Sequence, residues 1–122
     1  MYTIEFYKDK DGNEPVKEYI SSLAGKNDKD SRVNLNKIRD YIKTLSEYGT
    51  RAGEPYVKHI EGEIWELRPL RNRILFFGYD GNKIILLSHF IKKTQKTPQR
   101  EIDKAKRLMK DHKERSNGDE KK

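Results

Sequence analysis

Apolar residues change their spacing along the chain, and these changes predict where helices and strands lie. Residues 2–7 alternate between apolar and polar side chains, which is typical of a half-buried strand. Apolar positions then recur every three or four residues up to Gly25 and again over residues 31–48, so two helices are expected. Alternation and short apolar runs return in four further stretches, which predict strands at residues 56–60, 64–70, 72–79 and 83–91.

Residues with special backbone preferences mark the ends of these elements. Asn13 is a candidate helix cap before Pro15, and Gly49 stands where a helix end favours a positive φ. Asp80-Gly81 predicts a tight hairpin between the last two strands. Thr97 is the expected cap of a final helix whose first residue is Pro98.

The element order β-α-α-β-β-β-β-α predicts an α+β fold. We expect a helical hairpin packed on a mostly antiparallel sheet, followed by a C-terminal helix. Strand 83–91 is apolar on both faces and is therefore expected to be central and covered on both sides. Strict alternation in it would place Ser88 with Leu86 on one face and His89 with Leu87 on the other. We expect one domain over residues 1–115 and a disordered tail over residues 116–122, which contain no apolar residue.

The composition restricts the classes of partner. Of the 122 residues, 39% are charged and only 33% hydrophobic, and the formal net charge is +7. Such an excess of cations favours a polyanionic partner, namely nucleic acid, an anionic membrane or an acidic protein, although a merely basic surface stays possible. The absence of a signal peptide and of an apolar run long enough to span a bilayer leads us to expect a soluble, cytoplasmic protein.

Metal and cofactor motifs are absent from the sequence. There is no cysteine, and the three histidines (His59, His89 and His112) lack the spacing of a zinc motif. The chain has no glycine-rich phosphate loop and no serine-hydrolase motif either. We therefore expect no metal and no cofactor.

Cations cluster at the ends of the predicted strands. Arg68 ends one strand, Arg71 and Arg73 flank the next turn, Lys92 and Lys93 follow the last strand, and Lys58 and His59 lie on a neighbouring strand. If these ends converge, they form a site able to cut RNA without metal, because the RNA supplies its own 2′-OH nucleophile. The protein must then remove that proton, stabilise the charged phosphorane and protonate the leaving 5′-oxygen.

Each of these residues also has a structural interpretation. Arg68 is a possible ion-pair partner of Glu66 or Glu101, and the lysines are possible solvated loop residues. His89 is a candidate for a buried, hydrogen-bonded histidine, whereas His59 could lie on the surface. Trp65 fits a core or a protein interface better than a base-stacking platform.

Two segments carry a resemblance to a known family. The segment Ile64-Trp65-Glu66-Leu67-Arg68 and the segment Phe90-Ile91-Lys92-Lys93-Thr94-Gln95-Lys96-Thr97-Pro98, with Arg73 opening a strand between them, resemble the phage-derived HigB-like branch of the RelE/ParE toxin superfamily. The resemblance covers nearly the whole chain and includes the order of the elements.

The resemblance implies the toxin of a type II toxin–antitoxin pair. HigB-like toxins are mRNA interferases that enter the ribosomal A site and cut the message, and RelE-type cleavage leaves a 2′,3′-cyclic phosphate. The implied partner is a HigA-like helix-turn-helix antitoxin. The pair would repress its own promoter, so operator DNA would be bound only through the complex.

The resemblance also implies roles for individual residues. Arg68, Arg73, Lys92 and Lys93 match the family's cationic positions, and His59 is a candidate for proton transfer. We expect RNA contacts from Lys58, Arg71 and Lys96. Relatives often carry a histidine where this chain has Ser88, and strand alternation turns His89 to the opposite face, so the general base is His59 or a lysine.

Two other functions fit the same fold. One is a non-enzymatic, ParE-like inhibitor of DNA gyrase. The other is a phage-type protein that binds nucleic acid without catalysis. The converging cations favour the endonuclease over both.

Overall fold

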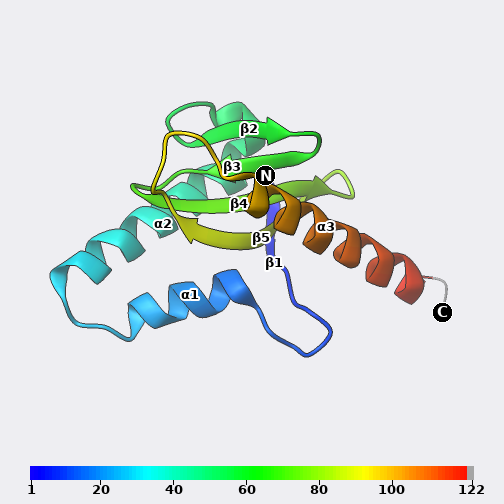
Figure 1. Cartoon of the computed structure of the whole chain (residues 1–122), viewed down its shortest axis with the longest axis horizontal. Helices are drawn as coiled ribbons and strands as arrows, with labels where there is room; N and C mark the ends of the chain where they lie inside the picture. The colour runs from blue at the N-terminus through cyan, green and yellow to red at the C-terminus, as the bar shows by residue number, and fades with distance from the viewer. Residues whose placement is uncertain (121–122) are drawn as a thin grey trace.

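The structure, a computed structural model, describes residues 1–120 and has a five-stranded sheet at its centre (Figure 1). In chain order the elements are β1 (Thr3–Phe6), α1 (Pro15–Ala24), α2 (Lys29–Tyr48), a short 3-10 helix η1 (Gly49–Ala52), β2 (Val57–Glu61), β3 (Ile64–Leu67), β4 (Asn72–Tyr79), β5 (Lys83–Ile91) and α3 (Gln99–Glu120). The predicted α+β class and the predicted order of elements are therefore confirmed.

The strands lie in the order β1-β5-β4-β3-β2. Each pair from β2 to β5 is antiparallel, whereas β1 runs parallel to β5 with Thr3 opposite Lys83. The sheet is thus mostly antiparallel, as predicted. The helical hairpin carries the chain from β1 at one edge to β2 at the other, which leaves β5 inside the sheet.

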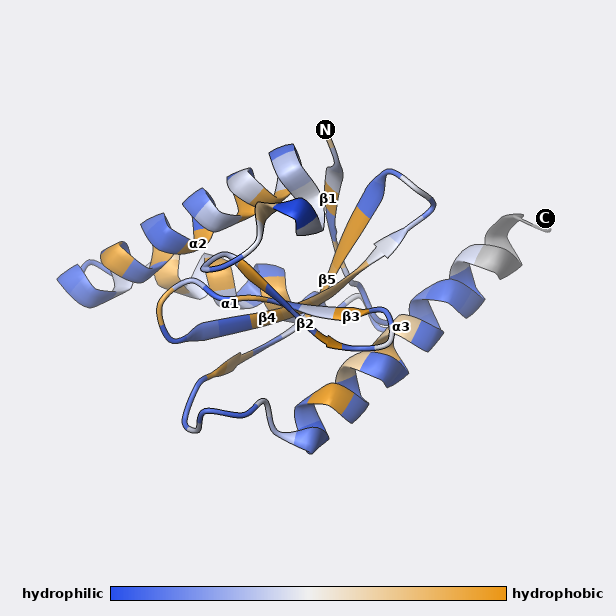
Figure 2. Ribbon diagram, turned by 90° about the horizontal axis from the view of Figure 1, so that it is seen from above, coloured by the Kyte–Doolittle hydropathy of each residue, from blue (hydrophilic) through white to orange (hydrophobic). Residues whose placement is uncertain are grey.

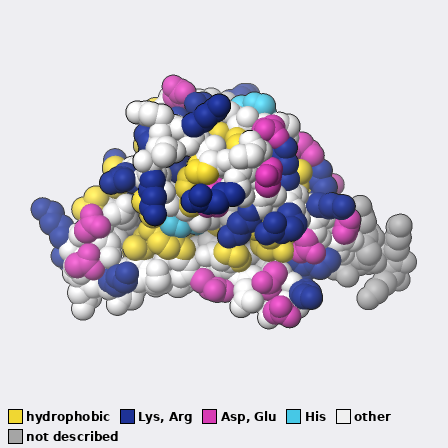
Figure 3. Space-filling model, viewed as in Figure 1, with side chains coloured by type: hydrophobic (Ala, Val, Ile, Leu, Met, Phe, Trp, Pro, Cys, Tyr) yellow, Lys and Arg dark blue, Asp and Glu magenta, His cyan; other side chains and the backbone are white. Residues whose placement is uncertain are grey.

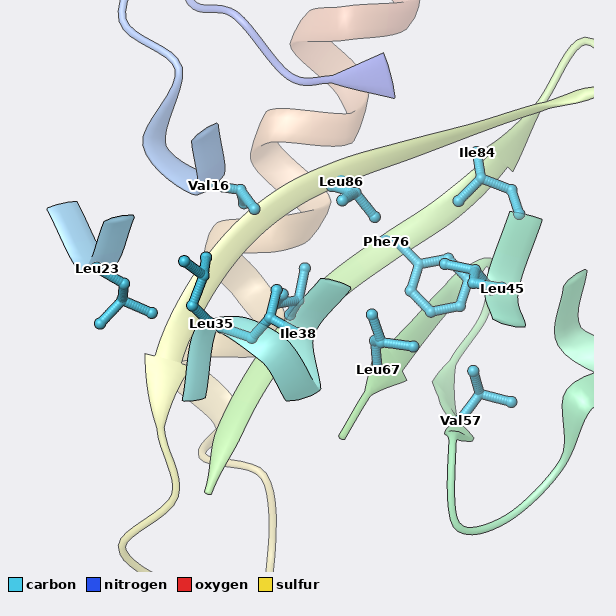
Figure 4. Packing of buried hydrophobic residues seen from close by; sticks show 11 residues of the cluster. Val16, Leu23, Leu35, Ile38, Leu45, Val57, Leu67, Phe76, Ile84 and Leu86 are labelled. Carbon is cyan, nitrogen blue, oxygen red and sulfur yellow. The ribbon is translucent and has the colours of Figure 1, made fainter. Parts of the chain in front are cut away.

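Helices cover both faces of this sheet. The pair α1 and α2 lies on one face and α3 on the other, so the apolar stripes of the helices face inward (Figure 2). The core under the hairpin joins residues of α1 and α2 to the sheet, and Figure 4 shows Val16, Leu23, Leu35, Ile38, Leu45, Leu67, Phe76 and Leu86. A second core under α3 contains Tyr7, Ile64, Leu75, Phe77, Ile85, Leu87 and Ala105. The prediction that residues 83–91 form a central strand covered on both sides is confirmed.

A β-bulge changes the faces of β5 near its end. Leu75 pairs with Ser88, but the next residue of β4, Phe76, pairs with Leu86, so Leu87 is an extra residue on β5. Paired residues share a face, which puts Ser88 beside Leu75 on the α3 face and His89 beside Ile74 on the hairpin face. The predicted strict alternation is wrong beyond Leu87, because a bulge inserts a residue that periodicity does not reveal.

Several element ends differ from the sequence-based expectation. Asn13 does not cap α1; its backbone and side chain bind the carboxylate of Asp9 instead. Asp28 caps α2 by accepting from the Ser31 backbone N–H, so α2 starts two residues earlier than expected. The β3 strand ends at Leu67, before Arg68. Gly49 has φ +60°, as its position predicts.

The last helix differs from expectation at both ends. It starts at Gln99 rather than Pro98, and the Pro98 carbonyl accepts from the backbone N–H groups of Glu101 and Ile102. It continues to Glu120, past the expected domain end at residue 115. A helix that packing has already nucleated can be extended by polar residues, since each added residue gains one hydrogen bond. The expected tail also includes residues 121–122, which lie outside the described residues.

Candidate functional site

A buried carboxylate, that of Glu66, organises the candidate site. Glu66 pairs with Leu75 and therefore faces α3, where it is only 1% exposed. Its Oε1 lies 3.3 Å from Arg68 Nε and 3.7 Å from Arg73 Nε, and its Oε2 accepts from Thr97 Oγ1 at 2.8 Å. A buried carboxylate requires such partners, because an unpaired charge away from water is very costly.

The two arginines are held differently. Arg73 is 6% exposed, and its Nη1 donates to the backbone carbonyls of Leu70 at 2.8 Å and Asn72 at 2.9 Å. Burial, and then the charge of Arg68, lower the pKa of Arg73 from its ordinary value. Arg73 is therefore fixed inside the protein, where it braces the turn that carries Arg68.

Arg68 is the more accessible of the pair. Its side chain is 22% exposed, and its contact with Glu66 goes through Nε. Among the described residues, no hydrogen bond engages its two terminal nitrogens, and Nε itself is buried without a hydrogen-bond partner of good geometry. The guanidinium is thus held by one edge while its terminal N–H groups remain available for a phosphate.

The loop of residues 92–98 lies over Glu66 and Arg73 and adds three lysines. Lys92, Lys93 and Lys96 line a narrow pocket together with those two residues. The loop is anchored at one end by Thr97 on Glu66 and at the other by Arg71, whose Nη2 donates to the Lys92 carbonyl at 2.9 Å. Figure 3 shows Lys and Arg side chains gathered across this side of the molecule. Arg73 and the three lysines therefore come together in one pocket, and Arg68 is joined to them through Glu66.

The structure does not bring His59 to the two arginines. His59 pairs with Trp65 and so lies on the hairpin face of β2, opposite to Glu66. Its Nε2 donates to the Gly62 carbonyl at 2.8 Å, and its ring lies 5.0 Å from that of Trp65. Lys58, which pairs with Glu66, is on the α3 face. Both residues nevertheless border a hollow that Lys96 also lines.

His89 is a half-buried, hydrogen-bonded residue on the hairpin face. Its ring stacks on Tyr19 at 3.6 Å, and its Nε2 donates to Asn72 Oδ1 at 3.0 Å. Burial lowers the pKa of His89 to about 4. The neutral form is therefore favoured, and His89 takes no part in the cluster around Glu66. Ser88 points to the α3 face, but it is fully buried and its Oγ has no hydrogen-bond partner among the described residues.

Sequence reasoning missed the role of Asn72. This fully buried residue accepts from the Tyr19 hydroxyl at 2.8 Å, and its Nδ2 donates to Asn34 Oδ1 at 2.8 Å and to the Pro69 carbonyl at 3.1 Å. It thereby ties both helices of the hairpin to the turn between Arg68 and Arg73. The only available signal was an asparagine at the start of an apolar strand, where it needs buried partners.

The site supplies cationic, hydrogen-bonding groups. The described residues contain no group of three or more His, Asp, Glu or Cys side chains placed to hold a metal ion. Guanidinium groups and lysines suit the binding of phosphate oxygens. None of the described helices is long and apolar enough to cross a membrane.

Comparison with known proteins identifies the family. No curated protein matches the chain. The family model of the phage-derived protein Gp49-like family (DUF891) matches residues 27–110, which include Glu66, both arginines and the lysine loop. The match spans more than half of the chain, from α2 into α3. The protein therefore belongs to the phage-derived Gp49-like family, a RelE/ParE-like family of toxins.

Proposed function

We propose that this protein is the toxin of a type II toxin–antitoxin pair and acts as a ribosome-dependent mRNA interferase of the HigB-like branch. The observation that carries the proposal is Arg68. Glu66 holds it through Nε, and no hydrogen bond from the described residues engages its terminal nitrogens. The same Glu66 borders the pocket that Arg73 and the three lysines line. The family match supports a toxin, and this arrangement of cations supports phosphodiester chemistry as its activity.

The proposed reaction requires no metal. The RNA 2′-oxygen attacks the adjacent phosphorus while the bond from phosphorus to the 5′-oxygen breaks, which leaves a 2′,3′-cyclic phosphate and a free 5′-hydroxyl. Arg68 would donate two N–H groups to the non-bridging oxygens and so stabilise the charge that grows on them. Arg73 would act as a positioning residue, because its N–H groups already bind backbone carbonyls.

The remaining cations would hold the message and move protons. Lys93 and Lys96 line the pocket beside Arg73, Lys58 shares a hollow with Lys96, and Arg71 binds the Lys92 carbonyl. These four residues would bind flanking phosphates. Lys92 is half-buried beside Glu66 and would protonate the leaving 5′-oxygen. A lysine or His59 would accept the 2′-hydroxyl proton; the position of His59 across the sheet favours the lysine.

The proposal also specifies partners and location. The toxin would act in the cytoplasm, in the A site of the ribosome, on translated mRNA. A HigA-like helix-turn-helix antitoxin would neutralise it, and operator DNA would be bound through that complex. Because phosphate contacts dominate binding to nucleic acids, the affinity for RNA should fall steeply with salt.

Primer extension on a translated message tests the activity. With purified ribosomes, the wild-type protein should create new 5′ ends inside the reading frame, and without ribosomes it should not. Arg68→Ala should reduce cleavage by about 10²–10³, the usual effect of losing one preorganised donor. Arg68→Lys should restore little, since a point charge cannot replace a planar fork. Arg39→Ala removes an exposed arginine of α2 and should have no effect.

The same assay can contradict the proposal. Cleavage by Arg68→Ala at the wild-type rate would exclude Arg68 from the site. An intact message together with a DNA-damage response would instead indicate a ParE-like inhibitor of DNA gyrase. An intact message without growth arrest would leave a nucleic-acid-binding protein that is not a toxin.

A further inference from the structure

A groove on the hairpin side of the molecule has two exposed aliphatic residues in its lining. This groove, of about 580 Å³, lies between α1, α2 and the ends of β4 and β5. Leu70 and Ile91 line it with 44% and 42% of their surface exposed, and Tyr19 and Leu23 of α1 complete its apolar wall. Single exposed apolar residues are common on protein surfaces, but two that share a groove indicate a binding surface.

The backbone of Leu70 adds a second, independent observation. Leu70 has φ +58°, in the left-handed backbone region that residues other than glycine rarely adopt. Glycine at this position would remove both the backbone strain and the exposed apolar side chain. A leucine is thus unfavourable here in the isolated chain for two reasons. Strain of this kind persists mainly where a side chain has a function, such as contact with a ligand.

The rim of the groove determines the charge of its ligand. Lys26, Arg71 and Lys93 are basic residues along it, against one acidic residue, Asp30. A ligand that fits would present aliphatic side chains to Leu70 and Ile91 and carboxylates to the three cations. We propose that this groove binds an acidic amphipathic segment of a partner protein; on the proposed function, that partner is the antitoxin.

RNA fits this groove less well than a protein segment. Binding of single-stranded RNA favours aromatic surfaces on which bases stack. The aromatic ring in this groove is that of Tyr19, which already stacks on His89, and its hydroxyl donates to Asn72. The exposed apolar groups are aliphatic, which favours contact with the apolar face of a peptide.

The groove adjoins the candidate site through its basic rim. Lys93 lines both the groove and the pocket beside Thr97, and the Arg71 carbonyl accepts from the Lys92 backbone N–H at 2.8 Å. A segment bound in the groove would therefore cover Lys93 and fix the start of the lysine loop. A segment bound there would block the approach to the site past Lys93, and it would do so without contacting Arg68.

Methyl NMR with two probes tests this inference. The first probe is a synthetic helical peptide with leucines on one face and glutamates on the other; the second is a 2′-O-methylated single-stranded RNA, which cannot be cleaved. The peptide should shift the methyl signals of Leu23, Leu70 and Ile91, and added salt should weaken its binding. The RNA should leave the Leu23 methyl signals in place, because its phosphates would contact Arg71 and Lys93 on the rim and not the wall formed by α1.

Leu70→Gly separates binding from folding. It should weaken peptide binding about tenfold, because one buried aliphatic contact is lost. The variant should be at least as resistant to thermal unfolding as the wild type, since glycine adopts a positive φ without strain. Val33→Ala, which shortens an aliphatic side chain of α2 that is also 42% exposed but outside the groove, should bind like the wild type.

Three results would overturn the inference. They are a peptide that shifts none of these signals, equal affinity of the peptide for Leu70→Gly and the wild type, and shifts of the Leu23 signals by RNA in place of the peptide. None of these measurements uses cleavage or growth arrest. The binding test of the groove and the cleavage test of the proposed nuclease activity can therefore fail independently of each other.

Discussion

The Nε atom of Arg68 lies 3.3 Å from Oε1 of Glu66, so an almost fully buried carboxylate holds the more accessible arginine of the site. Arg73 shares the same oxygen at 3.7 Å, and Thr97 binds the other one. The carboxylate therefore does more than neutralise one arginine. It fixes the relative positions of two cations and of the loop that ends at Thr97.

Removing the Glu66 carboxylate should destabilise the fold. Glu66→Ala leaves Arg68 and Arg73 next to each other without a counter-charge and should cost about 3–5 kcal/mol of unfolding free energy, as breaking a buried ion pair does. Glu66→Gln keeps the volume and an acceptor for Thr97, so it should cost less. Urea unfolding measures both changes.

A surface ion pair provides the control for that experiment. Glu61 pairs with Lys106, and both side chains are more than two-fifths exposed. Glu61→Ala should therefore change the unfolding free energy by no more than about 1 kcal/mol. A Glu66→Ala protein that unfolds at the same urea concentration as Glu61→Ala would show that the carboxylate does not support the site.

His89 should make the fold sensitive to acid. Its pKa is lowered to about 4 by burial, while an unfolded histidine titrates near about 6.5. Below about pH 6.5 the unfolded chain therefore binds a proton that the folded protein does not. Stability is full above that pH and falls as the pH drops towards 4, by a total on the order of 3 kcal/mol.

Denaturant unfolding between about pH 7 and pH 4.5 checks this prediction. His89→Gln can still donate a hydrogen bond to Asn72 but cannot titrate, so its stability should fall less over this range. Some pH dependence should remain, because the pKa of His112 is also lowered, mainly by burial. An unchanged slope in His89→Gln would mean that His89 does not titrate as burial requires.

Gly49 should be far less tolerant of alanine than Gly62. Both have a positive φ, +60° and +55°, so each replacement carries a backbone cost of at least about 1 kcal/mol. A Cβ on Gly49 would also lie 2.7 Å from Cε2 of the Tyr2 ring, whereas one on Gly62 would meet no atom within 4 Å. Thermal unfolding should therefore show the larger loss for Gly49→Ala, and equal losses would mean that Tyr2 moves away freely.

Much of the fold could be predicted from local pattern. The helical spacing, the Asp80-Gly81 turn and the two apolar faces of residues 83–91 are each properties of a few neighbouring residues, and each held in the structure. Helix starts were less well predicted, since Asn13, Thr97 and Asp28 are all reasonable caps. Which of them caps a helix depends on competing partners; Thr97, for example, binds Glu66 instead.

The site itself could be predicted only in part. The clustering of Arg68, Arg73 and the lysines follows from the positions of strand ends. The contact of Thr97 with Glu66 joins residues 31 positions apart, and that of Tyr19 with Asn72 joins residues 53 apart, so no local pattern contains them. The bulge at Leu87, which turns Ser88 towards α3, is equally invisible to alternation.

The parallel pairing of β1 with β5 has a consequence for synthesis of the protein. Thr3 meets Lys83, so the first strand of the chain waits for a partner that is made about 80 residues later. The lysine loop and Thr97 follow later still. The sheet therefore cannot close, and the cluster around Glu66 cannot assemble, until the chain has been made through β5 and Thr97. Products of premature termination before residue 97 would lack Thr97 and should not assemble the proposed site.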